Sequence, residues 1–259
     1  MIDKSKRFMR KYVPLEDQET LKGKRLDFDS VAAMFLDRAG ITPDRPLVYY
    51  YDDTISYARV NDRANAVAAF LEEKGVKKGD VVSIMILNSP EIYYTMFGAQ
   101  KLGCIAGSVN YMLKGPEIAY VLEDSKPKVV FVGSDYMEEF ARGFNMSAHK
   151  PLVVEAVTDV AHSEKISGIT LGEIIETYPT RERLVKQSPD DPTLLLYSSG
   201  TTGMPKGILL SNRNELCICK GTAAFGTSRP DDVFMIILPM FHAVSYTHLR
   251  AHETVLDLV

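Results

Sequence analysis

Apolar side chains recur at helical spacing between residues 57 and 74. One face of the predicted helix carries Val60, Ala64, Val67, Ala68 and Leu71, which follow the i, i+4, i+7, i+8 and i+11 positions. Ser56 stands where a helix N-cap is expected, and Gly75 stands where helices commonly end. The pattern predicts a helix over residues 57–74.

Residues 81–87 form an unbroken apolar run, which is typical of a strand buried on both faces of a parallel sheet. A helix over residues 90–102 should follow, with Asn88 or Ser89 as its cap and Pro90 in its first position. Further strands are predicted over residues 47–51, 104–109, 129–132, 152–157, 193–197, 208–210 and 233–238, and further helices over 116–124, 135–142, 171–177 and 212–222. This alternation predicts an α/β fold, a mostly parallel sheet with helices on both faces.

The pattern also suggests how the chain is divided. Residues 1–46 are interpreted as an N-terminal lead-in, because their first thirty positions are rich in charged residues and hold no strong period. Residues 47–243 form the domain that carries the alternation, and residues 244–259 are set apart as a tail. Residues 158–193 are less regular and are interpreted as a long surface connection into a second part of the sheet.

Composition narrows the function classes. The 259 residues include 30 Lys and Arg against 34 Asp and Glu, a formal net charge of −4, so no general attraction to nucleic acid is expected. Three scattered cysteines are too few for a disulfide framework. No apolar segment follows the basic N-terminus, and the run over residues 81–87 is far shorter than the roughly 20 residues that cross a bilayer. We expect a cytoplasmic protein with at most peripheral membrane contact.

The segment from Tyr197 to Gly207 carries the candidate chemistry. It reads Tyr-Ser-Ser-Gly-Thr-Thr-Gly-Met-Pro-Lys-Gly and combines glycines, hydroxyl side chains and one lysine. These are Gly200, Gly203 and Gly207, Ser198, Ser199, Thr201 and Thr202, and Lys206. Glycines let backbone amides approach an anion, hydroxyls add hydrogen-bond donors, and a lysine supplies a positive charge. The composition predicts a cradle for a polyphosphate, and a flexible surface loop is the alternative.

The loop is not the common P-loop. That motif places glycine directly before the lysine and serine or threonine after it. Here Pro205 precedes Lys206 and Gly207 follows it.

Residues 198–207 resemble the phosphate-loop signature of the adenylate-forming enzymes, which include acyl-CoA synthetases, peptide-synthetase adenylation domains and luciferases. Further segments similar to motifs of this superfamily are 55–57, 79–82, 101–103, 122–125 and 238–242. Three positions depart from the usual pattern: Ser198 replaces a threonine, Ser108 a proline and Asn212 a histidine. None of these changes removes a charge that the chemistry needs.

The resemblance implies that residues 47–243 are a partial, incomplete N-terminal AMP-binding domain. It implies an ATP-dependent acid–thiol ligase, which activates a carboxylic acid as an acyl-adenylate and transfers the acyl group to coenzyme A, with Mg²⁺ on the ATP. The ionised carboxylate needs no general base in the first step. The resemblance also implies that ATP is bound by Ser198, Ser199, Gly200, Thr201, Thr202, Gly203, Lys206 and Gly207. Lys206 and Thr201 are the catalytic candidates, and His242 is the candidate for the acyl pocket. The segment around Phe241 and His242 favours fatty or other apolar acids.

The last sixteen residues do not resemble the continuation of this superfamily. Residues 244–259 are similar to a translated sequencing adapter, so we expect native sequence to end near Ala243. Another interpretation makes His242, His248 and His252 metal ligands, but the order of a zinc-protease motif is absent, and no metal-ligating residue is assigned. The chain is expected to be a fragment that is inactive alone. Two alternatives stay open: a non-catalytic nucleotide-binding remnant, and an adenylation domain acting on another carboxylate.

Overall fold

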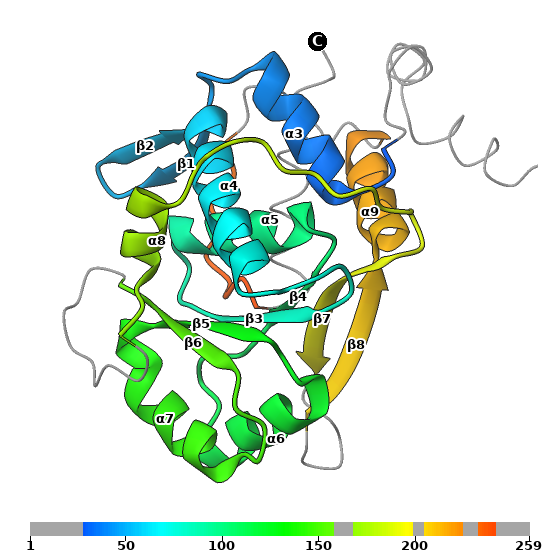
Figure 1. Ribbon diagram of the computed structural model, residues 1–259. Helices are drawn as coiled ribbons and strands as arrows, with labels where there is room; N and C mark the ends of the chain where they lie inside the picture. Colours follow the sequence, from blue (N-terminus) through cyan, green and yellow to red (C-terminus); the bar gives the residue numbers. More distant parts are fainter. Residues whose placement is uncertain (1–27, 158–167, 199–204, 225–232, 242–259) are drawn as a thin grey trace, which may run out of the picture.

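A six-stranded sheet forms the centre of the computed structural model, which describes residues 28–157, 168–198, 205–224 and 233–241 (Figure 1). The strand order is β6-β5-β3-β4-β7-β8, and every neighbouring pair is parallel except β7 and β8. The strands are β3 (Val81–Met85), β4 (Ile105–Ser108), β5 (Val129–Gly133), β6 (Leu152–Ala156), β7 (Pro192–Ser198) and β8 (Lys206–Ser211). A separate antiparallel hairpin joins β1 (Pro46–Tyr50) to β2 (Asp53–Ser56). The predicted α/β architecture is confirmed.

Helices cover both faces of this sheet, with α4 and α5 on one side and α6 and α7 on the other (Figure 1). The helices are α3 (Val31–Ile41), α4 (Tyr57–Glu73), α5 (Pro90–Lys101), α6 (Gly115–Ser125), α7 (Met137–Met146), α8 (Leu171–Thr177) and α9 (Asn212–Ala224), with a 3-10 turn at Ser134–Tyr136. Two apolar clusters lie between these layers, one under each set of helices. Alternate side chains of β5 serve both, since Phe131 belongs to the first cluster and Val130 and Val132 to the second. This is why the strand sequence is apolar at every position.

Both ends of α4 lie where the sequence predicts, whereas the predicted cap of α5 differs. Ser56 Oγ accepts a hydrogen bond from Arg59 N at the start of α4, and Gly75, with φ +75°, follows its end. Ser89 occupies the N-cap position of α5, but its side chain makes no capping hydrogen bond. Asn88 is turned to residues far along the chain instead. The predicted capping side chain of α5 is therefore wrong.

This difference gives a matched test of capping. Ser30→Ala is expected to lower the free energy of unfolding by about 1 kcal/mol, because Ser30 Oγ accepts a hydrogen bond from Ala33 N at 3.1 Å in the N-cap of α3. Ser89→Ala removes no such bond and should cost much less. Urea unfolding of both variants measures the two effects, and equal losses would contradict the assignment of Ser30 as the cap that matters.

Helix α3 was not predicted, because its apolar stripe is short and lies close to a charged stretch. It is nonetheless part of the core: the ring of Phe35 is fully buried and stacks on Phe97, with 3.9 Å between the ring centroids. Val31 N, in its first turn, donates to the buried Asn212 Oδ1 at 3.2 Å. The division of the chain at residues 46 and 47 stays a prediction, as does the separate tail at residues 244–259, which lies outside the described residues.

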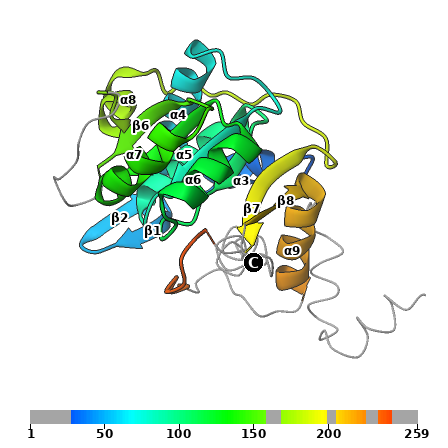
Figure 2. The same ribbon diagram turned by 90° about the horizontal axis from the view of Figure 1, so that it is seen from below.

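Residues 233–238 were predicted to be a strand, and this prediction is wrong. The segment pairs with no strand in the described part of the chain and runs outside the sheet, as its orange-red trace shows in Figure 2. Val233, Met235 and Ile237 are 69%, 83% and 78% exposed. A strand needs hydrogen-bonding partners on its edge, and the contacts that hold this segment come from side chains instead.

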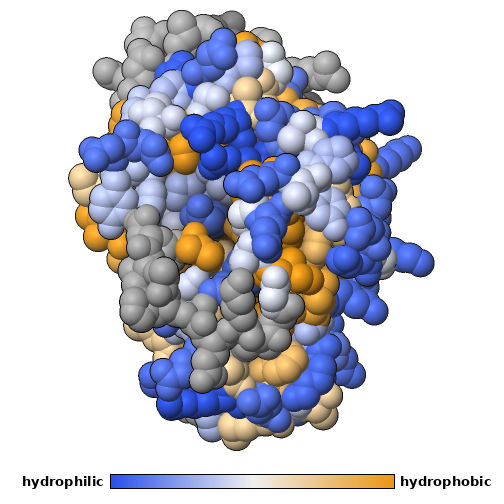
Figure 3. All heavy atoms as spheres, turned by 60° about the vertical axis from the view of Figure 1, so that its left-hand side comes forward, coloured by the Kyte–Doolittle hydropathy of each residue, from blue (hydrophilic) through white to orange (hydrophobic). Residues whose placement is uncertain are grey.

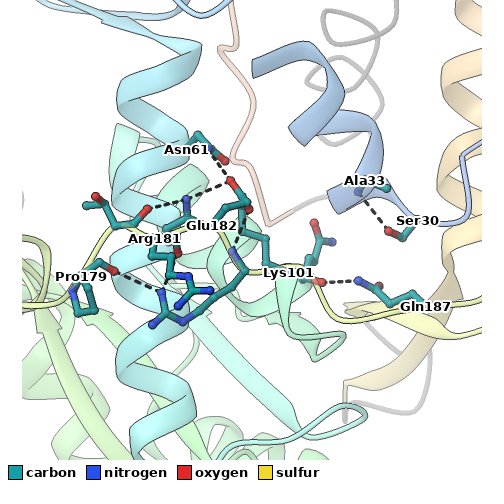
Figure 4. A network of polar contacts seen from close by, with 12 residues as sticks. Ser30, Ala33, Asn61, Lys101, Pro179, Arg181, Glu182 and Gln187 are labelled. Atoms are coloured by element: carbon teal, nitrogen blue, oxygen red, sulfur yellow. Dashed lines mark hydrogen bonds and ion pairs between the residues drawn. The ribbon is translucent and has the colours of Figure 1, made fainter. Parts of the chain in front are cut away.

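A strap of irregular chain, residues 178–191, crosses α4 and α5 (Figure 4) and forms part of the long surface connection expected over residues 158–193. The side chain of Lys101, which is fully buried, pairs with Glu182, and Asn61 Nδ2 donates to the same carboxylate at 2.9 Å. Backbone contacts extend the attachment: Val185 N donates to Lys101 O at 2.8 Å, and Gln187 Nε2 donates to Gln100 O at 2.8 Å. The strap therefore fixes the approach to β7, the strand that leads into the phosphate-loop sequence.

Candidate functional site

The two strands that flank the loop hold its ends together. In the antiparallel pair of β7 and β8, Ser198 lies opposite Lys206 and Tyr197 lies opposite Gly207. Ser198 Oγ donates to Lys206 O at 3.5 Å, and the side chain of Lys206 is exposed. Five candidates between these ends lie outside the described residues: Ser199, Gly200, Thr201, Thr202 and Gly203. Their assignment to phosphate binding stays a prediction.

Tyr197 ties the base of the loop to helix α6. Its hydroxyl donates to Asp124 Oδ2 at 2.6 Å. Burial raises the pKa of the Tyr197 phenol, and the hydrogen bond to Asp124 raises it further, so the donor keeps its proton across the physiological range. Sequence reasoning noted both residues inside motifs without pairing them, because they stand 73 positions apart.

Gly207 allows this arrangement to be compact. A Cβ atom at this position would come within 3.2 Å of Leu195 Cδ1, 3.4 Å of Tyr197 Cε1 and 3.5 Å of Asp124 Oδ2. A side chain there would press on the Tyr197–Asp124 contact. Gly207 therefore allows a close approach of backbone and side chains at the base of the loop, while its assignment to ATP binding stays a prediction.

The sheet has a topological switch point at its carboxyl edge. From β3 the chain crosses through α5 to β4 on one side, and from β4 it crosses through α6 to β5 on the other side of β3. In open α/β sheets, ligands bind in the crevice outside the carboxyl ends of the strands at such a point. Strand β7 is parallel to β4, so Ser198 ends at the same edge. The loop and the switch point therefore share one side of the molecule.

Residues 233–241 are held against this crevice from outside. Asn88, directly after β3, donates from Nδ2 to Leu238 O at 2.9 Å and accepts from Met240 N at Oδ1 at 2.7 Å. The ring of Phe241 meets Tyr111, after β4, edge to face with 5.0 Å between centroids. The residue that follows, His242, lies outside the described residues. The structure thus brings Phe241 to the switch point. The role of His242 in an acyl pocket stays a prediction.

Asn88 and Tyr111 are site residues that sequence reasoning missed. Asn88 was assigned to helix capping, and Tyr111 was assigned nothing. Tyr111 also stacks on Tyr136, with 4.8 Å between centroids, so three aromatic rings gather where β4 and β5 end. The sequence points to these two residues in one way only: Asn88 directly follows a predicted strand, and Tyr111 lies near the end of another.

The two described ends of the loop carry three of the residues predicted to bind phosphate. An exposed lysine, a serine hydroxyl and a glycine without a side chain lie together at the mouth of the loop. Among the residues that the structure describes, no group of three or more His, Cys, Asp or Glu side chains could hold a metal ion. A Mg²⁺ ion bound there would take its oxygen ligands from phosphates and hydroxyls, which Mg²⁺ accepts. Within the same described ranges, no helix is both long and apolar enough to cross a membrane.

Comparison with known proteins identifies the family. Residues 35–251 match the family described as "AMP-binding enzyme", which is well over half of the chain. The chain belongs to the AMP-binding enzyme family. Among curated relatives, long-chain-fatty-acid–CoA ligase FadD13 of Mycobacterium tuberculosis is 30% identical over 226 residues, covering 84% of this chain and 42% of the relative. The 4-coumarate–CoA ligase CCL1 of Humulus lupulus is 32% identical over 201 residues, covering 74% and 35%.

Solved structures of AMP-binding enzymes share the fold. The crystal structure of the anthranilate CoA ligase AuaEII in complex with anthranoyl-AMP aligns with a TM-score of 0.79 at 22% identity, over 91% of this chain and 45% of the other. This likeness concerns the fold, and the family match over residues 35–251 confirms the resemblance to adenylate-forming enzymes drawn from residues 198–207. The chain spans about 42% of the length of its FadD13 relative.

Proposed function

We propose that this chain is part of an ATP-dependent acid–thiol ligase that activates a carboxylic acid, by preference a fatty acid, and transfers it to coenzyme A. The observation that carries the proposal is the placement of the loop: in an AMP-binding enzyme, Ser198 and Lys206 stand paired at the carboxyl edge of the sheet, beside its switch point. The names of FadD13 and of CCL1 both state a CoA ligase activity, which supports coenzyme A as the acceptor.

The proposed chemistry has two steps. A carboxylate oxygen of the acid attacks the α-phosphorus of ATP, the bond from that phosphorus to the bridging oxygen breaks, and pyrophosphate leaves with its charge. The thiol sulfur of coenzyme A then attacks the acyl carbon, loses its proton, and displaces AMP. Because the acid is already ionised at neutral pH, the first step depends on charge stabilisation and in-line positioning.

Each residue has a proposed part in the first step. The Lys206 ammonium contacts the departing pyrophosphate, and Thr201 joins it as a donor to the reacting phosphates. Ser198, Ser199, Gly200, Thr202, Gly203 and Gly207 complete the phosphate cradle. Mg²⁺, when bound to the phosphates, neutralises part of their negative charge. His242 is proposed to line the acyl pocket, and the Tyr197–Asp124 contact fixes the base of the loop.

The acid, the location and the state of the 259-residue chain are proposed from the relatives and from composition. A fatty acid is favoured by the name of FadD13, whereas the name of CCL1 concerns coumarate, so another carboxylate is the second candidate. A cytoplasmic location with at most peripheral membrane contact, and no nucleic-acid partner, is proposed from composition. The 259 residues by themselves are proposed to bind phosphates without turnover, because they match only about two fifths of FadD13.

Exchange of labelled pyrophosphate into ATP tests the function. If the gene encodes a product longer than these 259 residues, that product should catalyse exchange that depends on an added fatty acid. The 259-residue chain should bind ATP and give no exchange above a blank without acid. Exchange by the short chain would contradict its inactivity. ATP binding without exchange by the longer product would favour the nucleotide-binding alternative over the ligase.

A further inference from the structure

A cavity of about 310 Å³ lies between the β1–β2 hairpin, α4, the start of α5 and the residue that follows β6. This volume is at the lower end of the range of small-molecule sites. Strands β7 and β8, which flank the phosphate loop, lie at the other edge of the sheet from β6, so the cavity is separate from that loop. On the face shown in Figure 3, which brings forward the β1–β2 side of Figure 1, hydrophilic surface lies directly beside apolar patches.

Arg63 supplies the positive charge of the cavity, and it is held in place from behind. This half-buried residue of α4 donates from Nη1 to the hydroxyl of Tyr94, and its guanidinium carbon lies 4.8 Å from the centroid of the Tyr94 ring. Because the Tyr94 side chain is fully buried, these two contacts fix the direction of the guanidinium. Within the described ranges, Arg63 forms no ion pair with a carboxylate.

Carboxylates line other walls of the same cavity. Glu91 lies half-buried in the first turn of α5, and Asp52 and Asp53 are exposed on the hairpin. Burial raises the pKa of the Tyr94 phenol, the charge of Arg63 opposes this rise and the charge of Glu91 adds to it, so both charges lie close to one hydroxyl. In the described part of the chain, none of the three carboxylates pairs with a cation. Charges of opposite sign therefore share the cavity without contacting each other.

These unpaired charges limit what the cavity can hold. An anion placed beside Arg63 would be repelled by the three carboxylates, and a cation placed beside the carboxylates would be repelled by Arg63. A molecule that carries both charges a few atoms apart can place each one beside its opposite. The rest of the lining is aromatic or aliphatic, with Tyr50, Ile55 and Val157 among it, and such a surface suits an apolar side chain.

We propose that this cavity binds a small zwitterion, an α-amino acid with an apolar side chain, whose carboxylate pairs with Arg63 and whose ammonium group pairs with Glu91. Asp52 and Asp53 add to the attraction for the ammonium group from the hairpin. The proposal does not depend on the ligase activity, because the cavity and the phosphate loop lie at different edges of the sheet.

Calorimetric titration of the 259-residue chain at pH 7 tests the two charges separately, with three probes that share a phenyl group. L-Phenylalanine carries both charges, 3-phenylpropionate carries only the carboxylate, and 2-phenylethylamine carries only the ammonium group. We expect saturable binding of L-phenylalanine. Each of the other two probes should bind at least about tenfold more weakly, because it lacks one charge-assisted hydrogen bond.

Variants assign each charge to its partner. Arg63→Gln should weaken L-phenylalanine about tenfold and should not weaken 2-phenylethylamine, whereas Glu91→Gln should weaken L-phenylalanine about tenfold and should not weaken 3-phenylpropionate. Arg59→Gln and Asp62→Asn are the matched controls, because they make the same changes of charge at exposed positions of α4 outside the cavity lining. Each control should change the affinity for L-phenylalanine by less than about twofold.

Several results would overturn the proposal. The first is an absence of saturable L-phenylalanine binding to the wild-type chain. Equally tight binding of 2-phenylethylamine would indicate a cation site made by the carboxylates, and equally tight binding of 3-phenylpropionate an anion site at Arg63. Effects of Arg63→Gln and Glu91→Gln no larger than those of their controls would also contradict it. The comparison of probes uses the wild-type chain, so it decides the question even where a variant fails to fold.

Discussion

Lys206→Ala is expected to lower the rate of acid-dependent ATP–pyrophosphate exchange by at least tenfold in any product of this gene that catalyses the exchange. Lys206 begins β8 opposite Ser198 and is exposed at the mouth of the phosphate loop. A hydrogen bond between a charged donor and a phosphate contributes about 1.5–3 kcal/mol, and about 1.4 kcal/mol is a tenfold change in rate. In the 259-residue chain, the same variant should weaken ATP binding by a similar factor.

The control for this prediction is another exposed lysine at the opposite edge of the sheet. Lys128 directly precedes β5, at the amino ends of the parallel strands. Lys128→Ala removes the same charge from the chain as a whole, so it corrects for a general loss of attraction to ATP. Equal effects of the two variants, or none from Lys206→Ala, would refute the assignment of Lys206 to the phosphates.

Glu182→Ala is expected to lower the free energy of unfolding by about 2–3 kcal/mol at pH 7. The Lys101 side chain is 0% exposed and pairs with Glu182, so the variant leaves a buried ammonium group without its partner. Removing one member of a fully buried pair costs about 3–5 kcal/mol, and we lower this value because Glu182 is 40% exposed. The variant also removes the acceptor that holds Asn61 and Asn65, at 2.9 and 3.2 Å.

The effect should depend on pH in a defined direction. Burial by itself would raise the pKa of Glu182, but the hydrogen bonds from Lys101 and Asn61 and the charge of Lys101 outweigh it, so the pKa is lowered in the folded chain. A carboxyl group with a lowered pKa stabilises the fold above its unfolded pKa, about 4.3, and loses this contribution as the pH falls through the folded value. The difference between wild type and Glu182→Ala should therefore be full at pH 7 and shrink below about pH 4.

Urea unfolding of wild type and Glu182→Ala at pH 7 and pH 3 measures the loss of unfolding free energy and its dependence on pH. Glu138→Ala is the control, because Glu138 pairs with Arg142 on the surface of α7, where both side chains are more than half exposed, and such pairs contribute about 0–1 kcal/mol. Lys101→Met combined with Glu182→Ala should recover part of the loss by removing the stranded charge. A loss no larger than that of Glu138→Ala would show that the strap is not held by this pair.

Much of the fold was predictable because its signals are local. The apolar run at residues 81–87 and the stripe from Val60 to Leu71 gave β3 and α4 close to their observed bounds. Helix α3 was missed because its stability comes from partners far along the chain, such as Phe97 and Asn212. Residues 233–238 have the composition of a strand, yet composition does not supply the neighbouring edge that a strand must pair with.

The candidate site also has one part that the sequence could predict and another part that it could not. The run from Ser198 to Gly207 was informative by itself, because glycines, hydroxyls and a lysine in that order predict a phosphate cradle wherever the segment folds. The anchors around it were not predictable, since Tyr197 and Asp124, and Asn88 and Met240, stand 73 and 152 positions apart and meet only through the crossovers of the sheet.

By itself, then, the sequence determined the fold class and the family, because periodicity and a contiguous motif are properties of neighbouring positions. Its assignment of the phosphate-loop residues stays a prediction. Only the tertiary structure decided that a pair of the buried Lys101 with Glu182 holds the strap, that residues 233–241 lie over the switch point, and that the Ser89 hydroxyl has no hydrogen-bond partner among the described residues. These features depend on which distant segments the sheet topology brings together and on how much water remains around each polar group. Neither can be read from the sequence, because the burial of a polar group and its hydrogen-bond partners are set only when the chain is packed.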